Sequence, residues 1–477
     1  MDSKKEQILT GSFDQDFHAL DAALRIGKSF DTVTKTMVIG ERKSKFYLVD
    51  GFAKDELMEK VMQFLLSAKA EDLSSLKTAQ EFSDRFIPYT ETEIVPEIHN
   101  VVTQVLSGTI ALIVDGFAGA VMIDARTYPA RSVAEPDDDR VLRGAHDGFV
   151  ETLVMNTALI RRRLRDPRLT MHYVRATDES RADVVLCYLD GVADQKTVDR
   201  LSKDISSIHA KTLTMGQESV AESLIPKQWF NPFPRIRYTE RPDTAAACVA
   251  EGKIIVITDN SPSVMLLPAT LFDFVQDTND FCFPPAVGTY LRLLRMAVFL
   301  LTLFLTPVWF LLVENPQWIP EWLAFIKVEE PNTVPIIAQL LVIEFMLDAL
   351  KIASLNTPSA LSTSFSVVSA LILGDFAIQA GWLVPEVVLY MAFVATGSFT
   401  QPSFELGYAF KFSRVVMIVL TAIFGVWGFV AAILLLILVV ACTRTITGGS
   451  YLAPLIPFDA RRFARLFFRA PISRKNT

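Results

Sequence analysis

The chain has 477 residues, of which 51% are hydrophobic and 21% are charged, and its net charge is −7. Residues 1–285 hold 33 basic and 43 acidic residues, whereas residues 286–477 are apolar and hold 13 basic and 10 acidic residues. An acidic front and an apolar back exclude a wholly soluble enzyme, a disordered chain and a disulfide scaffold, and the negative front argues against nucleic acid as a partner.

Residues 1–35 are polar and weakly periodic, and we expect them to form a mobile or partly helical N-terminal arm. The first residues, Met1–Gln7, contain no apolar run, so we expect no signal peptide and a front region that stays in the cytoplasm. Alternating and apolar runs begin at Thr36, and Asp55–Leu66 has the apolar spacing of an amphipathic helix. These features predict a first α/β subdomain over residues 36–140.

An internal repeat is the most informative feature of the front half. Residues 106–125 and 250–269 both read as an apolar strand, a turn and a second apolar strand, which is the pattern of a β-hairpin. A second pair of similar segments has nearly the same offset: Tyr47–Gly51 and Tyr188–Gly191. Each of these segments is followed by a helical pattern. Duplication is the favoured interpretation, with a second α/β subdomain over 169–285; chance similarity between two hydrophobic hairpins is the alternative.

A charged linker, residues 141–168, is predicted between the two subdomains. Its helix ends in Arg161, Arg162 and Arg165, where arginines suit the negative end of the helix dipole, and Pro167 marks the stop. The helix is either capped and solvated, or a strip for phosphate, membrane or inter-subunit contacts. In the last case its arginines would meet an acidic run of a neighbouring subunit, Asp137, Asp138 and Asp139.

Residues 286–445 predict a helical membrane domain. Met296–Val313 is uncharged and long enough to span a bilayer, and Arg292 and Arg295 place its start on the cytoplasmic side. Three further apolar stretches follow: Phe365–Ala380, Leu383–Ala395 and Val415–Ala441. The last is either one tilted helix or a tight helical hairpin.

The tail, residues 446–477, carries six basic residues against Asp459. This excess predicts a cytosolic tail lying on anionic lipid. With both ends of the membrane domain on the cytoplasmic side, the number of crossings must be even, either four or six.

One membrane segment, Pro335–Leu355, carries ionisable residues. Glu344, Asp348 and Lys351 stand at i, i+4 and i+7 and therefore share one helix face. After a break at Pro358, a hydroxyl stripe follows, and then an acidic residue: Ser359, Ser362, Ser366, Ser369 and Asp375. Charges and hydroxyls together are typical of a hydrated ion path. The alternative is a helix lying flat in the membrane interface, with serines that pack helices together.

No feature predicts catalysis. The four cysteines and five histidines are dispersed, without metal-ligand spacing, and no nucleotide-binding, nucleophile-elbow or zinc-protease motif occurs. We therefore expect no enzyme, no cofactor and no metal site. The predicted fold class is a multidomain membrane protein, with a duplicated α/β cytosolic N-terminal region followed by an α-helical transmembrane domain.

Several stretches resemble the hallmark sequences of the spore germinant receptor A-subunit family, the GerA family. They are Glu135-Pro136, Arg143-Gly144, Asp147-Gly148-Phe149, Leu159–Arg163, Arg241-Pro242-Asp243, Ser261-Pro262, Pro358-Ser359, Gly374-Asp375 and Tyr451–Phe458. The resemblance covers nearly the whole chain. Val367–Leu373 departs from it, because many members carry glycines there.

The resemblance implies a place in the inner membrane of the bacterial endospore, with two cytosolic subdomains. It also implies ring homo-oligomers, typically pentamers, that pass ions, and in one branch a small membrane-protein partner and amplified ion release during germination. A ring would gather copies of Glu344 and Asp348 around an axis and favour monovalent cations, with Lys351 paired to Asp348 or gating. A secondary transporter and a non-conducting scaffold or receptor subunit are the alternatives.

Overall fold

The computed structural model describes residues 7–87, 91–127, 144–176, 182–208, 216–225, 230–328, 333–356 and 376–469. The chain forms two compact units. Unit 1 comprises residues up to 226 together with 236–268, and unit 2 comprises residues 227–235 together with 269 onward.

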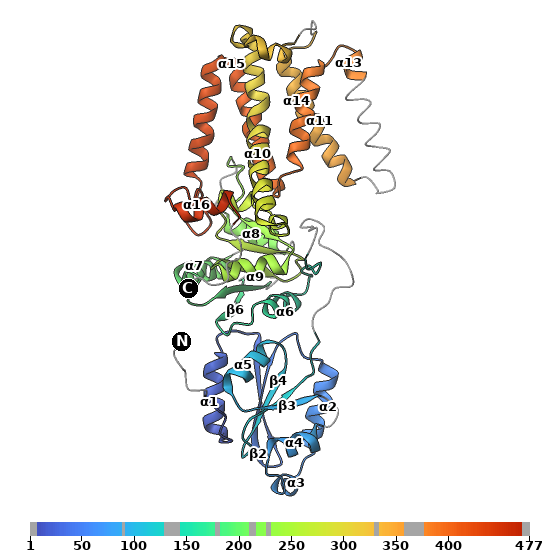
Figure 1. Ribbon diagram of the computed structural model, residues 1–477, viewed down its shortest axis with the longest axis vertical. Coiled ribbons are helices and arrows are strands. Elements are labelled where there is room, and N and C mark those ends of the chain that lie inside the picture. Colours follow the sequence, from blue (N-terminus) through green and yellow to red (C-terminus); the bar gives the residue numbers. More distant parts are fainter. Residues whose placement is uncertain are drawn as a thin grey trace. The chain divides into compact units, whose positions relative to one another are not determined.

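Unit 1 contains two five-stranded sheets with the same strand order (Figure 1). The first sheet has the order β1 (Thr32–Ile39), β2 (Arg42–Val49), β4 (Ile110–Val114), β5 (Ala120–Ile123), β3 (Thr92–Val95). The second has the order β6 (Leu169–Arg175), β7 (Asp183–Leu189), β9 (Ile254–Thr258), β10 (Val264–Leu267), β8 (Arg237–Thr239).

The helices of unit 1 repeat as well. Each half has a leading helix, then two strands, further helices, a strand, a helix and the final hairpin. The helices are α1 (Phe13–Leu24), α2 (Asp55–Leu66), α3 (Ala70–Ser74), α4 (Ala79–Phe86) and α5 (Ile98–Leu106), then α6 (Leu153–Arg163), α7 (Gln195–Ser206), α8 (Gln217–Leu224) and α9 (Pro242–Ala250). The repeated topology agrees with the predicted duplication. All pairings in both sheets are antiparallel, so the halves are α+β rather than parallel α/β.

The central strands are buried on both faces. In β4, Ala111 and Ile113 pack with α1 and α5, while Ile110, Leu112 and Val114 pack with α2 and α4 on the other face. Alternate side chains of a strand point to opposite faces, so a continuous apolar run suits a strand that is covered by helices on both sides.

The two halves also share a specific capping contact. The backbone N–H of Phe13 donates to Asp115 Oδ1 at 3.2 Å, and that of Leu153 donates to Asp259 Oδ1 at 3.1 Å. Each aspartate lies in the turn of the final hairpin and satisfies a free N–H at the start of the leading helix. The two halves therefore agree in the contacts between distant segments as well as in strand order.

Two predicted segments have a different role in the structure. Part of the predicted N-terminal arm forms α1, whose Leu20 and Leu24 are fully buried. The predicted linker helix is α6, the counterpart of α1, with Leu159 and Ile160 in the second core. Neither helix is a solvated connector, because each closes one face of its own sheet.

Unit 2 is helical. Its helices are α10 (Pro285–Glu314), α11 (Ile336–Asn356), α13 (Ala377–Gln379), α14 (Pro385–Ser398), α15 (Phe404–Cys442) and α16 (Ala460–Phe467), with short 3₁₀ turns η1 (Leu271–Phe274), η2 (Thr278–Phe281), η3 (Pro316–Trp318) and η4 (Glu321–Ile326). Within the described residues, α10 and α15 are the two helices long and apolar enough to cross a bilayer. They contain the predicted stretches at 296–313 and 415–441, whereas 365–375 lies outside the described residues.

The long segment α15 reverses direction. Gly425 has non-helical dihedral angles, with φ 60° and ψ −136°. Phe410 lies 6.2 Å from Phe233 between ring centroids, and Thr443 accepts a hydrogen bond from Asn231 at 2.8 Å. In a straight helix, residues 410 and 443 would be about 50 Å apart. Both ends therefore meet the same loop only because α15 is a hairpin, which confirms the second of the two predicted alternatives.

Candidate functional site

A buried ion-pair network joins α11 to the first limb of α15. Glu344 and Asp348 are four residues apart on α11, and Lys411 and Arg414 are three apart on α15, so each pair presents its charges on one helix face. Arg414 Nε donates to Glu344 Oε1 at 2.6 Å. Lys411 Nζ lies 3.6 Å from Glu344 Oε2 and also forms an ion pair with Asp348.

The network extends to a third helix. Arg414 Nη1 donates to the backbone carbonyl of Thr302 on α10 at 2.7 Å, and Lys411 Nζ donates to the carbonyl of Glu344 at 2.9 Å. The side chains of Glu344 and Arg414 are only 5% and 7% exposed. Removing charges from water is expensive, and here the two acids and two bases compensate one another while further hydrogen bonds satisfy the cations.

Asp348 is the member closest to solvent. Its side chain is 31% exposed, and its buried Oδ1 accepts no hydrogen bond from the described residues. Lys351 lies one turn further along α11, with Nζ 5.5 Å from the ring centroid of Tyr408 and 5.8 Å from that of Phe399. Both distances suit a cation–π interaction. The shared face predicted for Glu344, Asp348 and Lys351 therefore faces α15.

Sequence reasoning missed Lys411 and Arg414. Both precede the uncharged run that begins at Val415, and that boundary left them outside the predicted membrane helix. Their i, i+3 spacing complements the i, i+4 spacing of the acids, and this was the available signal. The expected acidic stripe is in fact a charge-balanced network, and Asp348 has Lys411 as an ion-pair partner.

Other predicted site residues lie outside the described residues. They are Ser359, Ser362, Ser366, Ser369 and Asp375 of the hydroxyl stripe, and Asp137, Asp138 and Asp139 of the acidic run. The structure therefore adds nothing to the predictions made for them.

The arginines of α6 do not behave as one strip. Arg161 is 1% exposed and pairs within the chain with Asp31, at 2.7 Å from Nε and 3.0 Å from Nη2. This corrects the prediction of an inter-subunit contact for Arg161, because its guanidinium is enclosed between the two halves of unit 1. Arg162 and Arg165 are exposed, and Arg165 Nε donates to the carbonyl of Arg162 at 3.3 Å.

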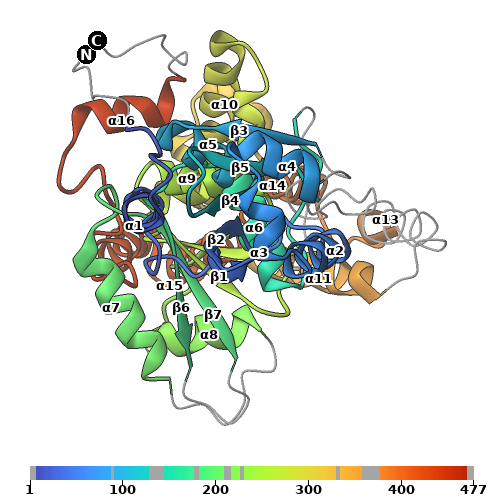
Figure 2. The ribbon, with the colours of Figure 1, turned by 90° about the horizontal axis from the view of Figure 1, so that it is seen from below.

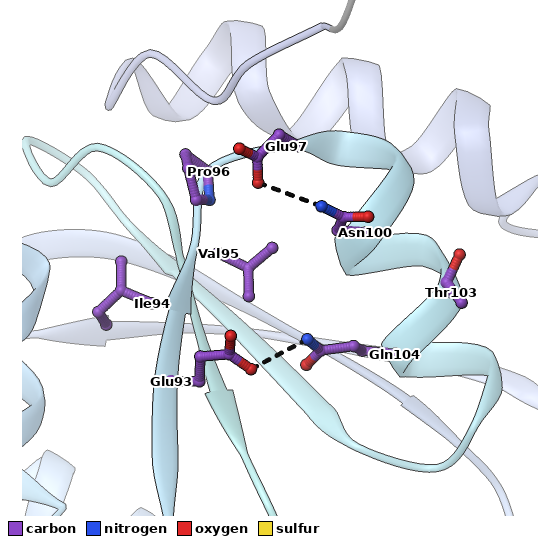
Figure 3. A pocket seen from close by; sticks show the side chains of 8 residues that line it. All are labelled: Glu93, Ile94, Val95, Pro96, Glu97, Asn100, Thr103 and Gln104. Atoms are coloured by element: carbon purple, nitrogen blue, oxygen red, sulfur yellow. Dashed lines mark hydrogen bonds between the residues drawn. The ribbon is translucent and has the colours of Figure 1, made fainter.

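Unit 1 also has an open groove of about 170 Å³ between β3 and α5 (Figure 3). Its carboxylates already have amide partners, since Gln104 donates to Glu93 at 3.1 Å and Asn100 donates to Glu97 at 3.3 Å. Within the described ranges, no group of three or more acidic, histidine or cysteine side chains is placed to hold a metal ion. The groove is therefore a weaker candidate than the network of unit 2.

A duplicated α+β unit and a helical unit with bilayer-length apolar helices define a membrane-associated protein of two parts. The family model described as Bacillus/Clostridium GerA spore germination protein matches residues 21–477, and the chain belongs to this family. The resemblance identified in the sequence is thereby confirmed.

Three relatives show how far the similarity extends. The chain is 38% identical over 451 residues to stage V sporulation protein AF of Bacillus subtilis (strain 168), covering 93% of this chain and 90% of the relative. It is 30% identical to the uncharacterized membrane protein YfkQ of the same organism, covering 78% and 72%, and 25% identical to its spore germination protein KA, covering 94% and 82%.

Among solved structures, the N-terminal domain of the A subunit of the Bacillus megaterium spore germinant receptor GerK3 matches with 22% identity and a TM-score of 0.44. The match covers 56% of this chain and 99% of that domain.

Proposed function

We propose that this chain is the subunit of a homo-oligomeric ion channel that promotes or amplifies ion release during spore germination. The channel would lie in the inner membrane of the endospore, with both termini in the cytoplasm, and would pass monovalent cations. Membership of a spore germination family supports the process. The proposal involves no catalytic step, and it leaves room for a small membrane-protein partner beside the ring.

The buried pair of Glu344 and Arg414 is the observation that carries the proposal. Replacing a buried ion pair by apolar residues of similar volume is often neutral or stabilising, so packing alone does not call for four charges here. Ionisable groups within apolar helices usually face a water-filled path or each other, and mark ion pathways. In this proposal, the charge-balanced network corresponds to the closed state of the channel, in which the carboxylates are paired with cations of the chain.

Opening would redistribute the partners of the network. Lys411 bridges Glu344 and Asp348, so movement of the α15 hairpin away from α11 would release both carboxylates together. In a ring, the released carboxylates of several copies would line one axis and favour cations over anions. Asp348, which is partly exposed, would be the first to meet a hydrated ion.

A receptor subunit that does not conduct is the second candidate. It is favoured by the two cations, Lys411 and Arg414, that already pair with Glu344 within the chain. In that case the network would only lock α11 to α15.

Assembly state separates the ring channel from a monomeric or dimeric transporter, and ion conductance separates both from a subunit that does not conduct. The purified full-length chain in mild detergent would be weighed by native mass spectrometry and imaged by particle averaging. We expect a closed ring, with five copies as the leading expectation, and with α11 and the first limb of α15 close to the axis. A monomer or dimer would overturn the ring and favour a transporter or a scaffold. A ring with these helices on its outer rim would refute the pore role of the network.

A further inference from the structure

The segment at residues 455–469, here called the basic–apolar segment, presents two kinds of side chain outward. In α16, Arg461, Arg462 and Arg465 are exposed, and no residue of the helix is buried. Just before it, Leu455, Ile456 and Phe458 are exposed by 40%, 55% and 67%. Large exposed apolar side chains next to a cluster of arginines are unusual on a surface that faces only water.

Two contacts fix the basic–apolar segment against the start of α10, and a third joins it to η1. Arg292 Nη1 donates to the carbonyl of Arg465 at 2.8 Å, and the backbone N–H of Arg469 donates to Thr289 Oγ1 at 3.1 Å. The rings of Phe272 and Phe463 lie edge to face at 6.4 Å. Because α10 is one of the two helices fit to cross a bilayer, α16 is held at the level where the apolar part of that helix begins.

The direction of α16 suits a membrane surface. In both views of the molecule α16 runs across the direction of α10 and α15 rather than along it (Figures 1 and 2). A helix perpendicular to the spanning helices and placed at their ends lies in the plane of the interface, where amphipathic basic helices bind.

The arginine side chains of α16 are exposed, in contrast to those at the start of α10. Arg292 lies 3.1 Å and Arg295 2.9 Å from the buried carboxylate of Asp280. The basic–apolar segment has four arginines and one acid, Asp459. Arg462 forms an exposed ion pair with Asp459 at 3.5 Å, and Arg469 donates to the carbonyl of Phe281 at 3.0 Å. The Asp459 carboxylate accepts the N–H groups of Arg461 and Arg462 at 3.0 Å each, and these bonds hold the pKa of Asp459 below its ordinary range.

We propose that the basic–apolar segment binds an anionic phospholipid leaflet. The exposed arginines of α16 would bind the phosphate headgroups, and Leu455, Ile456 and Phe458 would insert at the boundary of the acyl chains. Charge complementarity selects an anionic surface, and the apolar side chains select a lipid over free phosphate, which would satisfy only the arginines. The proposal does not depend on whether the chain conducts ions.

Hydrogen exchange of the full-length chain in lipid nanodiscs tests this surface. Peptides covering 455–469 would be compared in discs of phosphatidylcholine alone and in discs that also contain phosphatidylglycerol. We expect slower exchange in the anionic discs, and Arg461→Gln with Arg462→Gln should reduce this difference by about fivefold for each charge removed. Arg200→Gln, which changes an exposed arginine on α7 of unit 1, is the matched control and should leave the difference unchanged.

A second variant tests the apolar part. Phe458→Ser should speed exchange in both kinds of disc, because it removes the side chain that would enter the acyl boundary. Equal exchange of the wild-type chain in both discs would overturn the proposal. So would inorganic phosphate that reproduces the protection in phosphatidylcholine discs, since this would identify an anion site rather than a lipid surface. Protection that depends on protein concentration instead of lipid composition would assign the segment to a protein partner.

Discussion

Arg414 and Glu344 form a buried ion pair in the helical unit, with Nε and Oε1 2.6 Å apart. The pair connects the first limb of α15 to α11, and through the carbonyl of Thr302 it also connects both to α10. One guanidinium group therefore connects three helices, and its removal should lower the stability of the whole helical unit.

Replacing one partner should cost far more than replacing both. Arg414→Met leaves the Glu344 carboxylate buried with only Lys411 nearby, and should destabilise the protein by about 3–5 kcal/mol. Glu344→Gln with Arg414→Met should recover part of this loss. Thermal unfolding in detergent measures both, with Lys327→Met at an exposed position as the control. Equal losses in the single and double variants would mean that the pair contributes nothing specific.

The close approach of the two limbs of α15 depends on Gly428. A Cβ atom there would clash with the carbonyl oxygen of Leu420, which belongs to the backbone of the other limb. Gly428→Ala should therefore cost about 1–3 kcal/mol through overpacking. Gly407→Ala is the matched control, because its Cβ would meet only the flexible side chain of Gln401. Similar melting temperatures for the two variants would contradict the hairpin.

The repeated capping contact predicts equal effects in the two halves. Asp115→Ala and Asp259→Ala each remove an acceptor from the start of a helix, and each should cost about 1 kcal/mol. Asp204→Ala, which breaks only an exposed pair with Arg200, should cost less. Chemical denaturation followed by local hydrogen exchange reports the two halves separately. A loss at one aspartate and none at the other would break the equivalence.

A pH-dependent contribution is expected from Arg25 and Asp190. The hydrogen bond from Arg25 holds the pKa of Asp190 below its ordinary range. Because the pKa of Asp190 is lowered in the folded state, the pair stabilises the fold at pH values above the ordinary pKa of aspartate, near 3.9. This stabilisation is lost as the pH falls through the lowered pKa. Because both side chains are partly exposed, we expect less than about 1 kcal/mol at neutral pH.

Unfolding at several pH values measures this contribution. Arg25→Gln should be less stable than the wild type at pH 7, and the two should converge in acid. Asp190→Asn should converge with the wild type in acid in the same way, because the neutral amide resembles the protonated carboxyl group. A constant difference for Arg25→Gln across the whole range would show that the pair has no electrostatic role.

The sequence predicted the repeat because strand alternation and turn residues are local signals. Asp115-Gly116 and Asp259-Asn260 mark hairpins wherever the rest of the chain lies. The burial of α1 was not predicted from the sequence, because it depends on packing against a sheet whose strands lie far along the chain. The ion pair of Arg161 was not predicted for the same reason, because its partner Asp31 is 130 residues away in the sequence.

The candidate site was half predicted. Periodicity placed Glu344, Asp348 and Lys351 on one face, because helix geometry fixes which residues share it. The identity of the opposing helix depends on tertiary packing, so Lys411 and Arg414 could be read only by matching charge and spacing between two separate segments. A glycine in an apolar run permits a reversal but does not predict one. The reversal at Gly425 could therefore be recognised only from the contacts at both ends of α15.

Ion flux through the reconstituted full-length chain tests the central claim most directly. Liposomes containing the wild type should release monovalent cations faster than protein-free liposomes. Asp348→Asn, which keeps the pair of Glu344 and Arg414, should change the rate or the ion preference by severalfold. Glu321→Gln, at an exposed position in η4, should not. A wild type that assembles normally but releases ions no faster than empty liposomes would contradict the account.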